Sequence, residues 1–231
     1  MVGVGCGVST NDSHEDAREE PTTSETDDGV FDDRIADYPW LLGILTGTWT
    51  FVVGLAVMAV VVLAATDDPT VILDQPSAVF TDVGITFYNA HNVVADVRVV
   101  ESIANPDAVP ASLDFLSGPT SIPKAVYYAT PVVVLLAVGA LLAGRTLPRD
   151  ASLQEAVLPA GALSVGYTLF AVLGTFVVRG ERAEGVVLVV PNLSQAFVYG
   201  LLYSLGCGLV AGLAVLGWRN REAIQDGSAA E

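Results

Sequence analysis

Lysine is almost absent from this sequence, in which Lys124 is the single example. Against ten basic residues stand 26 aspartates and glutamates, and the net charge is −16. Nucleic acids and anionic lipids require basic surfaces, so this balance argues against both as partners. Carboxylates hold water well, and concentrated salt screens their mutual repulsion, so the acid excess predicts a halophilic protein. The alternative is a low-salt protein with an acidic interaction tail.

Cysteine and histidine are also scarce, with two of each in the chain. Cys6 lies in a polar stretch and Cys207 in an apolar run, so the two are not expected to pair, and neither belongs to a metal-binding spacing. His91 has no second histidine or cysteine nearby, and no serine or cysteine nucleophile is visibly paired with it. We therefore expect no metal and no cofactor, and a protein that is not an enzyme.

Four long stretches lack charged residues and histidine altogether. They cover residues 40–65, 125–143, 156–178 and 196–218. Each reaches or nearly reaches the ~20 residues that a helix needs to cross a bilayer. The sequence therefore predicts an all-α membrane protein with four transmembrane helices, the first within 38–65, and the lipid bilayer as its surroundings.

The ends of the chain differ from these apolar stretches. Residues 1–37 contain eleven acidic residues and two arginines. Such a composition, poor in aromatics and rich in Glu, Asp, Thr and Ser, predicts a disordered tail. Residues 219–231 form a second, shorter tail.

The arginines beside the spans predict the orientation. Arg145 and Arg149 flank the second and third spans, and Arg219 and Arg221 follow the fourth. Because cytoplasmic loops are enriched in Lys and Arg, we expect both termini in the cytoplasm. Residues 66–124 would then be extracytoplasmic, in a multi-pass protein of the cell membrane.

Small residues recur at four-residue intervals in the spans. The fourth span contains Gly200, Ser204, Gly208 and Gly212, and the first contains Gly43 and Gly47. Such stripes let helix backbones approach closely in lipid. We interpret them as helix-packing faces, toward another helix of the chain, a second copy, or a membrane protein partner. The spans' lack of charge argues against a proton-coupled transporter.

The stretch GITFYNAHNV, residues 84–93, concentrates polar and aromatic residues outside the spans. Apolar residues at three- and four-residue steps, Val79, Val83 and Phe87 among them, predict a short helix on the membrane surface or over the mouth of the bundle. Alternation over 93–100 favours a strand, so helix or strand stays open for 77–95.

Four residues of this stretch are candidates for extracytoplasmic recognition: Phe87, Tyr88, Asn89 and His91. In a helix Phe87 and His91 would share one face. The simplest interpretation makes His91 and the asparagines interfacial groups that bond to helix ends or lipid head groups. A ligand-binding or pH-sensing role for His91 is the alternative.

The FYNAH motif, the run VYYATPVVVLLAVGALLAG and two further Gly-rich spans resemble an uncharacterised family of small multi-pass membrane proteins of halophilic archaea. The resemblance covers residues 38–218 and implies no activity. We expect a structural or partner-binding membrane component. A subunit of a transporter, or of a small-solute channel formed by oligomerisation, is the alternative.

Overall fold

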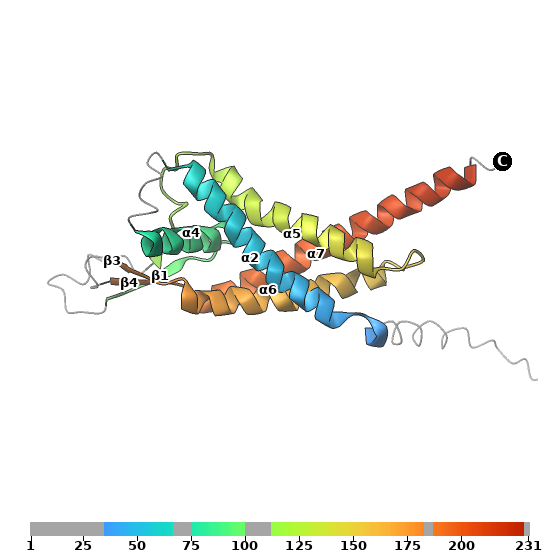
Figure 1. Ribbon diagram of the computed structural model, residues 1–231, viewed down its shortest axis with the longest axis horizontal. Helices are drawn as coiled ribbons and strands as arrows, with labels where there is room; N and C mark the ends of the chain where they lie inside the picture. Colours follow the sequence, from blue (N-terminus) through green and yellow to red (C-terminus); the bar gives the residue numbers. More distant parts are fainter. Residues whose placement is uncertain (1–34, 67–74, 100–111, 183–186, 229–231) are drawn as a thin grey trace, which may run out of the picture. The chain divides into compact units, whose positions relative to one another are not determined.

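The computed structural model describes residues 35–66, 75–99, 112–182 and 187–228. The expected disordered tail therefore lies almost wholly outside the described residues. The chain divides into two units, Met1–Ala36 and Asp37–Glu231. All the elements described below belong to the second unit (Figure 1).

Four helices within the described part of the chain are long and apolar enough to cross a membrane. They are α2 (Trp40–Ala64), α5 (Lys124–Thr146), α6 (Val157–Val177) and α7 (Leu193–Ser228). A short 3-10 turn, η2 (Gln154–Ala156), leads into α6. The predicted helical class is confirmed, and the four spans indicate a membrane protein. The helix α7 continues past Trp218 to Ser228, where the sequence predicted a tail.

The helix α6 is the most buried of the four spans. It packs against α2 on one side and α7 on the other, while α5 packs mainly against α7 and α2. Close approach depends on glycine: a Cβ at Gly47 or at Gly166 would overlap backbone atoms of the opposite helix. Lipid supplies no hydrophobic driving force between helices. Small residues at this interface let the backbones approach closely, so van der Waals packing stabilises the contact.

A helix and a small sheet occupy one end of the bundle. The helix α4 (Pro76–Ala90) lies beside α2, α5 and the strands (Figure 1). The strands are β1 (Ala95–Val99), β2 (Ser112–Leu113), β3 (Gly180–Arg182) and β4 (Val187–Pro191). The sheet has the order β2-β1-β4-β3, and all three pairings are antiparallel. We call α4 and this sheet the cap.

The cap answers the question that the sequence left open over 77–95, because it contains a helix and then a strand. Pro76 stands at the first turn of α4, where its missing N–H costs nothing. The strand β1 pairs with β4 from Ala95 opposite Pro191 to Val99 opposite Val187. The sequence did not predict this sheet, which joins the α2–α5 connection to the α6–α7 connection.

The helix α4 is not a surface helix, contrary to the first of the two expected placements. Residues 83–91 are all buried. The side of α4 that carries Thr81, Gly84 and Tyr88 meets both the bundle and the start of β3, where Thr81 Oγ1 donates a 2.8 Å hydrogen bond to the Arg179 carbonyl. Gly84 permits this contact, since a Cβ there would overlap the Val178 side chain. Glycine has a low helix propensity, but at this position of α4 it is required for packing.

Candidate functional site

The end of α4 has a defined geometry. The Val93 N–H donates to the Tyr88 carbonyl at 3.0 Å, and the Asn92 N–H donates to the Asn89 carbonyl at 2.9 Å. This pair of bonds is a Schellman motif, in which the residue after the helix cap adopts a left-handed conformation. Asn92 does so, with φ of 61°. The turn directs the preceding residue, His91, into the protein.

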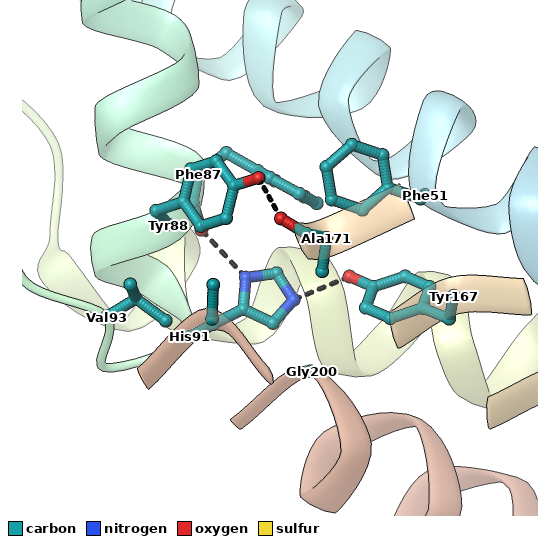
Figure 2. Close-up of a pocket in the computed structure, with 9 residues that line it drawn as sticks. Phe51, Phe87, Tyr88, His91, Val93, Tyr167, Ala171 and Gly200 are labelled. Atoms are coloured by element: carbon teal, nitrogen blue, oxygen red, sulfur yellow. Dashed lines mark hydrogen bonds between the residues drawn. The ribbon is translucent and has the colours of Figure 1, made fainter. Parts of the chain in front are cut away.

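His91 is bound at both ring nitrogens (Figure 2). Its Nδ1 lies 2.8 Å from the carbonyl oxygen of Phe87, and its Nε2 lies 2.6 Å from the hydroxyl of Tyr167 on α6. A carbonyl only accepts, so Nδ1 carries the proton and Nε2 accepts from Tyr167. The ring therefore bridges the last turn of α4 and the middle of α6 as a neutral group.

Two neighbours of His91 also bind within the protein. The Tyr88 hydroxyl donates to the Ala171 carbonyl on α6. Asn89 Nδ2 donates to the Val93 carbonyl at 2.8 Å, and its Oδ1 accepts from the Phe115 N–H at 2.9 Å. Each polar side chain of the FYNAH motif is thus bonded to the bundle or to the loop beside it.

Aromatic rings surround the histidine. Phe87 and His91 lie 4.6 Å apart between ring centroids, so the predicted contact at the i and i+4 positions is present. Phe51 of α2 meets Phe87 at 5.3 Å and Tyr167 at 5.6 Å, both edge-to-face. Tyr203 of α7 lies 5.2 Å from His91. Such pairs contribute roughly 0.5–1.5 kcal/mol each beyond their burial.

Burial sets the electrostatics of this centre. Desolvation lowers the pKa of His91 to about 4, although the Phe87 carbonyl favours the charged form. Desolvation also raises the pKa of the Tyr88 hydroxyl. Both side chains are therefore neutral at pH 7.

The space beside His91 is small. The cavity measures about 10 Å³ and is bordered by Phe51, Tyr88, Tyr167 and Gly200 (Figure 2). A site of about 10–15 Å³ holds one water molecule at most. Among the described residues there is also no group of three or more His, Cys, Asp or Glu that could hold a metal ion. This arrangement suits attachment of α4 to the bundle rather than binding of a substrate.

The four candidate recognition residues are therefore brought together, but they do not face outward as expected. Phe87, Tyr88, Asn89 and His91 are all buried, with His91 only 3% exposed. The expectation was wrong because the apolar stripe predicted one buried face, whereas the bundle, the sheet and the 112–117 loop cover the helix end on several sides. Their role in recognition stays a prediction.

The helix-packing residues lie between helices of the same chain. Ser204 is fully buried, and Gly200, Gly208 and Gly212 face Ala171, Ala160 and Ala156 of the α6 segment. Gly43 and Gly47 face Ala162 and Leu163 of the same helix. The stripe on α7 and the pair on α2 thus both pack on α6.

Sequence reasoning missed several partners of the site. Phe51, Tyr167 and Tyr203 stand in apolar spans, where an aromatic residue is unremarkable. The one available signal was Asn92, because Asn directly after a helix tolerates the left-handed conformation that ends it. The sequence around His91 did not indicate which aromatic rings would contact it.

Comparison with known proteins shows the family but no activity. No curated protein and no solved structure matches this chain. One family, described as of unknown function, matches residues 32–218, nearly the region over which the sequence resembles an uncharacterised membrane family. The chain belongs to this family of unknown function, DUF7978.

Proposed function

We propose that this protein is a non-catalytic structural component of a membrane, whose four-helix bundle holds the cap rigidly for contact with a membrane protein partner. The observation that carries the proposal is the pair of hydrogen bonds that the His91 ring makes, one to Phe87 in α4 and one to Tyr167 in α6. The Tyr88–Ala171 bond adds a second attachment to α6. An element fixed in this way presents one defined surface.

The same observations weigh against transport through a single copy. Aromatic rings fill the centre beside α4, and the cavity there is about 10 Å³. A channel built from several copies would need a packing face, yet the small-residue stripe of α7 lies against α6. No specific observation favours the transporter alternative.

A flux measurement tests the proposal. The full-length protein is reconstituted into vesicles loaded with a K⁺-sensitive or a pH-sensitive dye, and solute entry is followed by light scattering. We expect the rates of empty vesicles, with an ionophore setting the full signal. Flux that scales with the amount of protein would support the transporter alternative instead.

We further propose that both termini face the cytoplasm and that the cap lies outside the cell membrane. The supporting observation is that Arg219 binds the carbonyls of Gly144 and Leu147, at 2.7 and 2.9 Å, at the end of α5. This places Arg219 of α7 against the end of α5 that carries Arg145, at the bundle end remote from the cap, as positive-inside orientation requires.

Cysteine labelling tests this orientation. In a background with Cys6 and Cys207 replaced by serine, Phe80→Cys places a thiol on an exposed position of α4, and Arg221→Cys places one on an exposed position at the end of the last span. We expect a membrane-impermeant maleimide to label the first in intact cells and the second only after permeabilisation. The reverse pattern would refute the proposed orientation.

We also propose that the protein works in concentrated salt, as an archaeal halophile would require. The support is the sequence's net charge of −16 with a single lysine. The thermal midpoint should then rise steadily between dilute and near-saturated KCl. A flat or falling midpoint would favour the low-salt alternative.

A further inference from the structure

A groove of about 370 Å³ opens where the sheet meets the ends of two spans. Asp96 and Arg98 alternate on β1 and therefore project from the same face of the sheet, together with Val190 and Leu188 of β4 opposite them. Phe176 of α6 and Leu193 of α7 complete the border. The groove therefore lies at the boundary between the cap and the membrane-spanning part.

Two arginines give this groove its charge. Arg98 and Arg179 both border it and both are exposed, and among the described residues neither guanidinium group has a hydrogen bond or ion pair. The opposing charge in the groove is Asp96, and both of its carboxylate oxygens accept 3.1 Å hydrogen bonds from Asn192 Nδ2. Glu181 borders the adjoining hollow, which it shares with Arg179. The guanidinium groups are thus the cationic groups of the groove that remain available to an anion.

The wall below the arginines is apolar and continuous with the lipid-facing surface. Phe176 is 53% exposed and Leu193 is 47% exposed, and they stand at the ends of the α6 and α7 spans. The Arg179 guanidinium lies 6.0 Å from the centre of the Phe176 ring. This is the arrangement of an arginine that lays its stem along apolar surface and keeps its charge at the interface.

We propose that this groove binds the phosphate head group of an anionic membrane lipid, with the acyl chains along α6 and α7. Guanidinium groups bind phosphate oxygens through paired N–H donors, which suits two unpaired arginines beside an apolar wall.

The acidic character of the whole chain does not oppose this binding. Eleven of the 26 carboxylates belong to residues 1–37, and Asp96 is the carboxylate among the described residues that line the groove. Salt screens exposed charges beyond about 8–10 Å at ordinary ionic strength, so the two arginines that border the groove determine whether an anion binds there. The net charge of the whole sequence argued against anionic lipids, but it does not describe the charge of this groove.

Lipid retention in native mass spectrometry tests the proposal. The full-length protein in mild detergent receives equal amounts of dioleoyl phosphatidylglycerol or the zwitterionic dioleoyl phosphatidylcholine. We expect preferential retention of phosphatidylglycerol, weakened roughly fivefold by Arg98→Gln or by Arg179→Gln, and further in the double variant. The matched control is Arg221→Gln, which removes an exposed arginine at the other end of α7 and should leave retention unchanged.

Three results would overturn the proposal. They are equal retention of the two lipids by the wild type, unchanged retention in a double Gln variant, and displacement of the lipid by inorganic phosphate, which would indicate a free-anion site. Because both side chains are exposed, the double variant should keep the wild-type unfolding midpoint. The double Lys variant, which keeps the charges without the paired donors, should retain the lipid more weakly than the wild type and more strongly than the double Gln variant.

Discussion

The Nε2 atom of His91 lies 2.6 Å from the Tyr167 hydroxyl, and this bond joins residues 76 positions apart in the chain. It is made where both partners are buried, so neither group can exchange its bond for one to bulk water. Removal of this bond therefore measures how much it contributes to the attachment of α4 to the bundle.

Replacement of Tyr167 by phenylalanine should destabilise the protein by about 1–3 kcal/mol, because Nε2 of His91 then becomes a buried acceptor without a donor. The measurement is the free energy of unfolding from a detergent titration in mixed micelles, followed by circular dichroism. Tyr199→Phe is the matched control, since the Tyr199 hydroxyl has no hydrogen bond among the described residues. Equal losses in both variants would contradict the assigned bond.

The burial of His91 predicts a specific pH dependence. Its pKa falls from 6.5 to about 4 in the folded protein, so the unfolded chain binds the proton more readily between these values. Its stabilising contribution is therefore complete above pH 6.5 and is lost as the pH falls toward 4, by about 3 kcal/mol at most.

Comparison with His91→Gln isolates this contribution, because carboxylates titrate in both proteins and glutamine does not. Unfolding free energies at several pH values between 7 and 4 should fall less steeply in the variant. Parallel curves would show that His91 is not buried as a neutral group.

Alanine at Gly208 and at Gly206 should have opposite effects. A Cβ at Gly208 would lie 2.9 Å from Ala160 Cα, so α6 and α7 would have to separate, at a cost of about 1–3 kcal/mol. A Cβ at Gly206 meets nothing within 4 Å, and alanine there should be neutral or stabilising by up to about 1 kcal/mol. The measurement is the thermal unfolding midpoint of each variant in the same detergent. Similar midpoints would contradict the packing of the α7 small residues against α6.

Replacement of Asn92 separates backbone from side-chain contributions. Its Nδ2 donates a 2.7 Å hydrogen bond to Tyr203, which both alanine and glycine remove. Alanine alone also opposes the left-handed backbone, so Asn92→Ala should be less stable than Asn92→Gly by about 1–2 kcal/mol. Unfolding free energies measured side by side decide this, and equal values would mean that the turn after α4 is not left-handed.

The spans could be predicted because their physics is local. A run of about 20 uncharged apolar residues has one stable form in lipid, a helix that satisfies its own backbone hydrogen bonds. The contact of Phe87 with His91 follows equally from spacing within one helix.

The sheet and the burial of the FYNAH motif could not be predicted in this way. The strand β4 is a short apolar run, VLVVP, that periodicity does not distinguish from helix, and its partner β1 lies in a different connection. Likewise the stripe of small residues on α7 predicts a close contact, but the sequence does not identify the helix against which the stripe packs.

The sequence by itself thus determined the membrane class and the number of spans, and it indicated a helix over 77–95 without excluding a strand. Only the tertiary structure decided that this helix is buried, that His91 meets Tyr167, and that Arg98 and Arg179 border one groove. The physical reason is that helix formation and membrane insertion depend on neighbours within a few turns of chain. Burial, pairing and groove geometry depend on which distant segments pack together, and similar apolar segments offer many alternatives.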